Sequence, residues 1–265
     1  MDNEITQPAY NIQSLRIGAG LSDVDNIKPS ADFYSIAEES QSYKELEDKL
    51  AQHYEINAPS DLEKQCDIIA IRIAKLIESP SFSFRPTALA NIHQQLFEGV
   101  FEGKISRYIG IYRKHNITKK ESVIGGHSVQ YADHSEIADA LTYDFKEFDF
   151  DNLKALNQTA LTKEIARFTS RIWQVHPFIE GNTRTITVFM IKLLNRLGIV
   201  ADNSLFEKNA KYFRNALVLA NFSYHKDNVH IIENRKYLDN FFIQLFNGSA
   251  KPLPKLENPF EQLTN

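Results

Sequence analysis

The chain has 265 residues, of which 43% are hydrophobic and 24% charged, and this is the composition of an ordinary globular protein. Its formal net charge of −4 argues against nucleic-acid binding over the whole surface, although a local basic patch is compatible with it. The single cysteine, Cys66, excludes an intramolecular disulfide framework and a cysteine-only metal cage. No apolar run reaches the roughly 18 residues of a membrane span, and the acidic, polar start lacks a signal-peptide pattern. We therefore expect a cytoplasmic protein that does not act at a membrane.

The N-terminal part of the chain combines a polar segment with two predicted helices. Residues 1–40 show no sustained periodicity, which is typical of a loosely ordered arm. A helical pattern begins near Ser42, and another follows Pro59, where Ser60 and Glu63 form a capping-box pattern. Apolar residues of this second helix recur at steps of four and three, which predicts one buried face: Leu62, Cys66, Ile69, Ile73 and Leu76.

Residues 105–131 differ from their surroundings because they are rich in β-branched and aromatic side chains. Gly125 and Gly126 mark a turn, so we predict a β-hairpin with arms at 110–117 and 123–131. One end of this segment is basic, with Arg107, Arg113, Lys114, Lys119 and Lys120. These charges either protect an edge strand from aggregation or belong to a flap that docks an extended target segment. The sequence leaves both interpretations open.

The rest of the chain is predicted to be helical. A short helix carries Leu89, Ile92 and Leu96, two apolar stripes run through 161–175 and 186–197, and two further helices lie near 206–221 and 234–246. We therefore expect a mostly α-helical bundle with one inserted β-hairpin. The predicted organisation is an N-terminal arm and helical extension at 1–80, a catalytic domain at 81–250 and a tail at 251–265.

The segment between the two apolar stripes, His176 to Thr185, carries the side chains that are best suited to catalysis or ligand binding. Pro177 disfavours helix at His176, so the first helix should end there. Gly181 allows a tight turn, and the next helix should begin near Asn182. Because a helix N-terminus exposes unpaired N–H groups and partial positive charge, this turn predicts a site for an anion such as a phosphate.

Three side chains at this turn have complementary abilities. His176 can accept a proton from an attacking hydroxyl near neutral pH. Glu180 can supply the carboxylate that Mg²⁺ prefers beside phosphate oxygens, and Arg184 can hold those oxygens in a bidentate manner. This set is suited to transfer from a nucleotide to a hydroxyl. A zinc hydrolase is disfavoured, because Pro177 interrupts the helical face and no third zinc ligand is evident.

The nonapeptide HPFIEGNTR resembles the signature of Fic proteins, His-x-Phe-x-(Asp/Glu)-Gly-Asn-x-Arg, and matches it at every fixed position. Residues 110–113, GIYR, resemble the start of the family's flap hairpin, and the helices after the motif resemble those of one bacterial group of Fic proteins. The resemblance covers roughly residues 85–247. It implies a Fic-like helical fold and, in most of the family, transfer of AMP from ATP to a Ser, Thr or Tyr hydroxyl of another protein.

The resemblance also implies a role for each motif residue. His176 would be the catalytic base, Phe178 would anchor the loop in the core, and Glu180 would bind Mg²⁺ that bridges the nucleotide phosphates. The nucleotide phosphates would lie against four residues: Gly181, Asn182, Thr183 and Arg184. The flap residues Gly110, Tyr112 and Arg113 would bind the target protein.

Two positions depart from the common family pattern. The variable position before the arginine is often Gly but is Thr183 here, whose side chain either narrows the approach to the phosphates or adds a hydrogen bond. Many adenylylating members carry a second arginine that contacts the terminal phosphate and pairs with an inhibitory glutamate. That position is Thr187 here, which leaves both the nucleotide pose and the usual autoinhibition open.

No segment fully matches the family's inhibitory helix, (Ser/Thr)-x-x-x-Glu-(Gly/Asn). The segment 35–40 ends in Ser40, and Ser35 with Glu38 is better explained as a helix cap, while the segment 223–228 has Asp227 in place of Glu and is expected in a loop. We expect Glu39→Gly to activate the protein only slightly. We expect control to come instead from an antitoxin-like partner protein or from the arm before Ser42.

The sequence thus predicts a Mg²⁺-ATP-dependent protein adenylyltransferase. Two alternatives stay open, a Fic-like phosphotransferase with inverted nucleotide and a non-catalytic nucleotide-sensing module. The expected partners are a hydroxyl-bearing target protein and an inhibitory partner, with a homo-oligomer also open, and nucleic acid is not expected. The short motif Gly18-Ala19-Gly20 is not interpreted as a dinucleotide loop, since no strand precedes it and a third glycine is missing.

Overall fold

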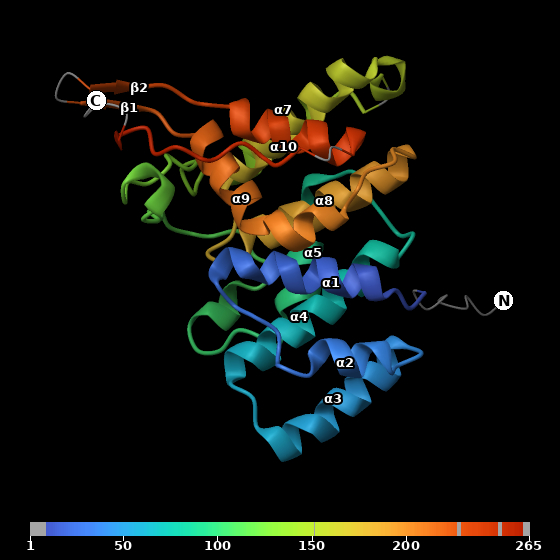
Figure 1. Cartoon of the computed structure of the whole chain (residues 1–265). Coiled ribbons are helices and arrows are strands. Elements are labelled where there is room, and N and C mark those ends of the chain that lie inside the picture. The colour runs from blue at the N-terminus through green and yellow to red at the C-terminus, as the bar shows by residue number, and fades with distance from the viewer. Residues whose placement is uncertain (1–8, 151, 227–228, 249–250, 262–265) are drawn as a thin grey trace.

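The structure is a computed structural model, which describes residues 9–261 except 151, 227, 228, 249 and 250. It is a layered helical bundle with one small antiparallel sheet (Figure 1). The helices are α1 Ile12–Ser22, α2 Phe33–Glu38, α3 Tyr43–Asn57, α4 Asp61–Glu78, α5 Pro86–Phe97, α6 Ile137–Glu147, α7 Gln158–Val175, α8 Asn182–Leu197, α9 Ser204–Ala220 and α10 Lys236–Asn247. The strands are β1 Tyr224–Lys226 and β2 Val229–Ile231, and short 3₁₀ turns lie at Asp23–Asp25, Ile105–Tyr108, Ser122–Ile124 and Leu153–Ala155. Within the described ranges, no helix is long and apolar enough to cross a membrane.

Helix α8 forms the centre of the main core. It is buried along most of its length, including its polar first turn, and it packs against α4, α5 and α7. A helix that is buried all round belongs to the interior of a bundle. Because α8 begins directly after the HPFIEGNTR loop, the core fixes the position of the predicted site.

The N-terminal residues are more ordered than the sequence predicted. Helix α1 lies between α4 and α9, so residues 12–22 belong to the body of the protein and not to a loose arm (Figure 1). Periodicity missed this helix because it contacts partners on several sides. Its side chains contribute both to the main core, through Ile17 and Leu21, and to a smaller core with α2 and α3, through Leu15 and Ala19.

The two glycines of α1 explain how it packs so closely. A Cβ atom on Gly18 would lie 2.5 Å from the carbonyl oxygen of Ala70 in α4, and one on Gly20 would lie 2.4 Å from that of Glu207 in α9. Both distances are too short for a side chain. Gly18 and Gly20 are therefore helix-packing residues of α1 and do not form a dinucleotide loop.

Several predicted helix boundaries are confirmed. Ser42 caps α3 by accepting from the Glu45 N–H at 3.1 Å, and Ser60 and Glu63 form the predicted capping box at the start of α4. Cys66 is fully buried, as predicted for a small core residue, and burial raises the pKa of its thiol to about 12. Leu62, by contrast, is exposed and does not belong to the buried face.

The segment 105–131, called here the flap segment, reverses direction where predicted but does not form the predicted strands. Gly125 and Gly126 have positive φ values of 64° and 84°, and a single bridge joins Glu121 to His127. The arms expected at 110–117 and 123–131 are otherwise irregular, and the strands lie instead in the short hairpin after α9, with Tyr224 paired to Ile231.

Competing hydrogen bonds explain the missing ladder. The Arg113 N–H donates to the Pro177 carbonyl at 2.8 Å, and the Lys119 N–H donates to the Ser128 hydroxyl at 3.1 Å. Backbone groups that would pair across a hairpin are thus used by the HPFIEGNTR loop and by a side chain. Periodicity and composition cannot show this competition, because it depends on tertiary contacts.

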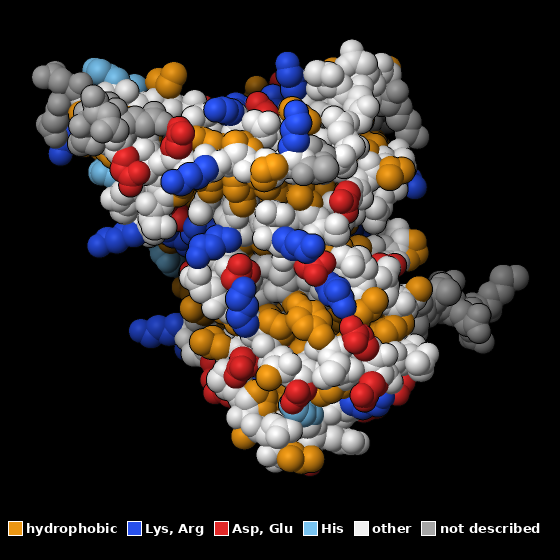
Figure 2. Space-filling view, in the orientation of Figure 1, with side chains coloured by type: hydrophobic (Ala, Val, Ile, Leu, Met, Phe, Trp, Pro, Cys, Tyr) orange, Lys and Arg blue, Asp and Glu red, His pale blue; other side chains and the backbone are white. Residues whose placement is uncertain are grey.

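The C-terminal residues return to the body of the protein. The Phe260 ring stacks on His127 of the flap segment, with ring centroids 4.5 Å apart, and Leu253 and Leu256 pack on the main core. On the face shown in Figure 2, lysine and arginine side chains are interspersed with aspartate and glutamate. That face therefore presents no large region of one charge sign.

Candidate active site

The predicted turn between α7 and α8 is present, and two left-handed residues shape it. Helix α7 ends at Val175, His176 follows with φ 51°, and Gly181 precedes α8 with φ 77°. A Cβ atom on Gly181 would lie 2.4 Å from Cε2 of Phe97 in α5. Glycine is thus required here for its backbone conformation and also for the close approach of the Phe97 ring.

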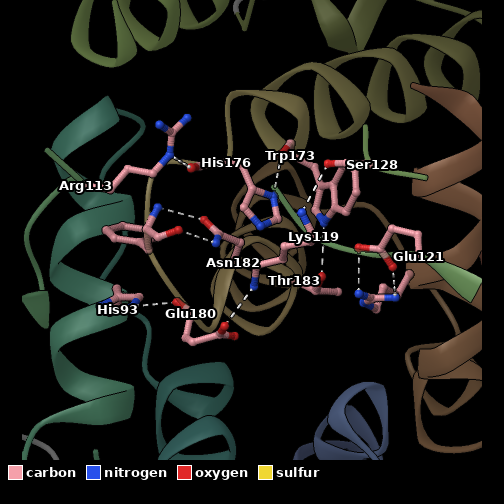
Figure 3. Close-up of polar contacts among 12 residues, drawn as sticks. His93, Arg113, Lys119, Glu121, Ser128, Trp173, His176, Glu180, Asn182 and Thr183 are labelled. Atoms are coloured by element: carbon pink, nitrogen blue, oxygen red, sulfur yellow. Dashed lines mark hydrogen bonds and ion pairs between the residues drawn. The ribbon is translucent and has the colours of Figure 1, made fainter. Parts of the chain in front are cut away.

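Internal hydrogen bonds hold the loop in one shape. The Asn182 side chain donates to the Phe178 carbonyl at 2.7 Å and accepts from the Phe178 N–H at 2.9 Å (Figure 3). Phe178 is fully buried, as predicted for the loop anchor, and its ring stacks on His93 at 3.9 Å. The Asn182 side chain therefore closes the loop, and Asn182 also lines the cavity at the start of α8.

His176 is buried between two aromatic residues, with 3% of its surface exposed. Its ring stacks on Tyr131 at 4.0 Å and meets the edge of Trp173 at 5.3 Å. Nδ1 lies 3.4 Å from the Trp173 carbonyl oxygen, which can only accept, so Nδ1 carries the proton. Nε2 is buried and has no hydrogen-bond partner among the described residues. Burial, and then the charge of Lys119, lower the pKa of His176 well below its usual value, which leaves Nε2 as an unprotonated acceptor.

The N-terminus of α8 has the predicted form of an anion site. The Thr185 N–H bonds to the Gly181 carbonyl at 3.0 Å as the first bond of the helical ladder, so the N–H groups of the preceding turn face outward from that ladder. Arg184 is buried, with its guanidinium carbon 4.8 Å from the centre of the Phe97 ring. Thr183 accepts a hydrogen bond from Trp173 Nε1 at 3.0 Å. Its hydroxyl is thus used inside the protein.

Glu180 lies at the more exposed edge of the same site and pairs with a cation. Its carboxylate is 3.0 Å from the Lys119 ammonium of the flap segment, and its side chain is 40% exposed. The backbone carbonyl of Glu180 accepts a hydrogen bond from His93 Nε2 at 3.0 Å (Figure 3). A carboxylate that already holds a positive charge, next to a helix N-terminus, fits the donor set of Mg²⁺ bound together with phosphates. Among the described residues, no group of three or more His, Cys, Asp or Glu could hold a metal ion.

The three predicted flap residues all turn toward the protein interior. Gly110 donates its N–H to His93 Nδ1 at 2.9 Å, and Tyr112 donates its hydroxyl to the Pro86 carbonyl at 3.0 Å. Arg113 is 2% exposed and its Nε donates to the His176 carbonyl at 2.9 Å. Other nitrogens of its guanidinium donate to the carbonyls of Val175, His115 and Ala132. In this structure Arg113 holds the HPFIEGNTR loop, and its side chain is not available on the surface for a target protein.

A second ion pair, which the sequence did not indicate, lies beside the motif. Glu121 of the flap segment is 1% exposed, and its two carboxylate oxygens lie 2.9 and 2.7 Å from two nitrogens of Arg214 in α9. A cavity of about 30 Å³ remains, lined by Val24, Lys119, His176, Glu180, Gly181, Asn182, Thr183, Arg184 and Arg214. This is room for about one water molecule. The structure therefore brings the predicted motif residues together in a closed state.

The two inhibitory-helix candidates lie elsewhere. Ser35 is inside α2 and donates to the Asp32 carbonyl at 2.9 Å, so the predicted cap is wrong. Glu39 is exposed at the end of α2, and no α2 residue lines the cavity. Asp227 is outside the described residues, although its neighbours form the hairpin β1–β2 and not a loop.

Fold and site together define a helical protein with a helix N-terminus that faces a buried histidine and a carboxylate. Residues 83–194 match the sequence model described as the Fic/DOC family. Residues 83–194 are therefore a Fic-family segment, as the nonapeptide indicated. No curated protein sequence matches it.

Three solved structures from Bartonella share the fold. The first is BepC, a VirB-translocated effector of Bartonella tribocorum with bound AMPPNP, which is 18% identical, has a TM-score of 0.52, and covers 70% of this chain and 85% of its own. The second is the N-terminal Fic domain of a putative cell filamentation protein of Bartonella quintana, at 22% identity, a TM-score of 0.51 and coverages of 70% and 81%. The third is the N-terminal Fic domain of Bep8 from Bartonella sp. 1-1C. It is 20% identical, has a TM-score of 0.51, and covers 72% of this chain and 89% of its own. At these identities the likeness concerns the fold alone.

Proposed function

We propose that this Fic protein is a protein adenylyltransferase, which moves AMP from Mg²⁺-ATP to a Ser, Thr or Tyr hydroxyl of a target protein. The observation that carries the proposal is the His176 Nε2 atom, which is buried, without a partner among the described residues, and part of the same cavity as Glu180 and Arg184. A purely structural histidine in that environment would satisfy its second nitrogen. The AMPPNP bound to BepC supports a nucleotide as the ligand.

Each residue has a defined task in this reaction. The target hydroxyl attacks the α-phosphorus, Nε2 of His176 accepts its proton, and pyrophosphate leaves. The N–H groups at the start of α8 and the Arg184 guanidinium bind phosphate oxygens and stabilise the charge that develops on them. Thr187 is fully buried and donates to the Thr183 carbonyl at 2.8 Å, so it offers no positive charge to the phosphates.

Glu180 is the residue that would hold Mg²⁺, which when bound neutralises phosphate charge during transfer. Its carboxylate is available once Lys119 moves away, since that ammonium is its partner in the closed state. The positive charges of Lys119, Arg113 and Arg214 all lower the pKa of His176. A nucleotide would bring negative charge into this region and so make His176 a stronger base than it is in the closed state.

Mass spectrometry of lysate proteins after incubation with Mg²⁺-ATP tests the proposal. We expect modified proteins to gain the mass of AMP in the presence of wild type and not in the presence of His176→Ala. A gain of phosphate alone would support the phosphotransferase alternative. No modification by wild type, together with measurable ATP binding, would support the nucleotide-sensing module.

A further inference from the structure

Arg214 is a second guanidinium in the site, and it comes from outside the family motif. It belongs to α9, thirty residues along the chain from Arg184, and it lines the same small cavity as His176, Glu180 and Arg184. Its charge is close enough to contribute to the lowered pKa of His176. The guanidinium is therefore placed where a ligand of the α8 N-terminus would meet it.

The partner of Arg214 is a carboxylate from the flap segment. Glu121 is buried and presents both oxygens to the guanidinium, at 2.9 and 2.7 Å (Figure 3). A phosphate group offers the same pair of charged acceptor oxygens to an arginine. The Glu121 carboxylate is buried and costly to leave unpaired, whereas the Arg214 side chain is 24% exposed and can exchange this carboxylate for another anion of similar geometry.

A second contact two residues earlier has the same character. The Lys119 ammonium lies 3.0 Å from the Glu180 carboxylate. The flap segment thus places a cation, Lys119, at the proposed metal position and an anion, Glu121, at Arg214. With both contacts made, the cavity of about 30 Å³ is too small for a phosphate chain. A nucleotide can enter only if residues 119–121 move, and this movement separates both pairs together.

We propose that Arg214 is a phosphate-binding residue of this site, and that Glu121 occupies its guanidinium until a nucleoside polyphosphate replaces the carboxylate. The inference rests on the proposed nucleotide function. It assigns Arg214 the positive charge that Thr187 does not provide, from a helix that the motif does not include. It also makes Glu121 a competitor of the nucleotide.

Calorimetric titration with ATP, ADP and AMP in Mg²⁺ buffer tests this assignment. Arg214→Gln should weaken ATP binding about tenfold or more, because a charged hydrogen-bond partner is lost, and should affect AMP less than ATP. Glu121→Gln, which keeps the shape but removes the charge, should strengthen ATP binding several-fold. In the Arg214→Gln background, Glu121→Gln should have little effect on ATP binding, because Glu121 competes with the nucleotide only for the Arg214 guanidinium.

A matched control is available in α7, where Arg171 lies 2.6 Å from the buried carboxylate of Asp144. Arg171→Gln removes an arginine–acid pair of the same kind away from the cavity, and ATP binding should stay within about twofold of wild type. Unchanged ATP affinity in a folded Arg214→Gln variant overturns the inference while the proposed function stands. If Arg214→Gln does not fold, Glu121→Gln decides, and an affinity equal to or below that of wild type overturns the inference. If neither wild type nor Glu121→Gln binds any of the nucleotides, the proposed function fails and the inference fails with it.

Discussion

At the scale of single residues, His93 of α5 connects two segments of the site through its two ring nitrogens. It looks like an ordinary position of α5, yet Nδ1 accepts from the Gly110 N–H at 2.9 Å and Nε2 donates to the Glu180 carbonyl at 3.0 Å. It thus joins the flap segment to the HPFIEGNTR loop. His176, Glu180 and Arg184 could be predicted because their spacing is local, whereas His93, Glu121 and Arg214 reach the site only through the tertiary fold.

His93 gives the protein a pH-dependent stability. Burial lowers its pKa from 6.5 to about 4, so between these values the unfolded chain binds more protons than the folded one. Its contribution is complete above pH 6.5 and is lost as the pH falls toward 4, and it amounts to about 3 kcal/mol. Urea unfolding at several pH values should show a shallower loss of stability for His93→Gln than for wild type. Equal slopes would contradict this assignment.

The environment of His176 predicts the pH dependence of catalysis. Because burial and Lys119 hold its pKa well below 6.5, the proton-accepting form persists as the pH falls through that value. We expect kcat/KM to stay level through pH 6.5 and to decrease only at lower pH. Lys119→Met should move the decrease to higher pH, because one of the charges that lowers the pKa is gone. A wild-type profile already at half its maximum at pH 6.5 would argue against the buried base.

At the scale of elements, the flap segment is where sequence and structure differ most. Its β-branched and aromatic residues predicted two strands, but the segment is bound to the HPFIEGNTR loop through Arg113 and to α9 through Glu121. The local sequence pattern indicates only a tendency to form strands. Here tertiary hydrogen bonds take the place of the backbone hydrogen bonds that would join two strands. The helices around the motif were predictable because Pro177, Gly181 and the capping residues mark their ends locally.

Arg113 should therefore be essential for the order of the catalytic loop. Arg113→Met removes hydrogen bonds to the carbonyls of His176 and Val175, which are buried, and we expect a loss of about 2–4 kcal/mol in the free energy of unfolding. Denaturant unfolding measures it. Lys114→Met, at the next and exposed position, is the control and should change stability by less than about 0.5 kcal/mol. An equally small change in the free energy of unfolding for Arg113→Met would show that Arg113 does not stabilise the loop.

At the scale of the whole molecule, α1 connects the N-terminal helices to the Fic core. The sequence predicted a loose arm because residues 1–40 are polar and show no sustained periodicity, and α1 contains two small residues, Gly18 and Gly20. The structure shows that the small residues serve close packing against α4 and α9, with contacts to Ala70 and Glu207. The overall helical class was predictable from composition and periodicity, while this three-helix contact was not.

The sign of the stability change on replacing a glycine of α1 tests this packing. In an exposed helix, Gly→Ala stabilises by about 1 kcal/mol. In α1, Gly18→Ala and Gly20→Ala should instead destabilise by about 1–3 kcal/mol, because each new Cβ atom would overlap a backbone carbonyl. Thermal unfolding of both variants gives the sign directly, and an increase in Tm for either would show that α1 is not tightly held there.

The proposed function depends above all on His176 acting as the base in transfer from a bound nucleotide. The most direct measurement is the ATP dissociation constant and the single-turnover transfer rate of His176→Ala beside those of wild type. A base role for His176 predicts nearly unchanged ATP binding and a transfer rate lower by about 10²–10⁴-fold, the range of a lost general base. A transfer rate equal to that of wild type would contradict it.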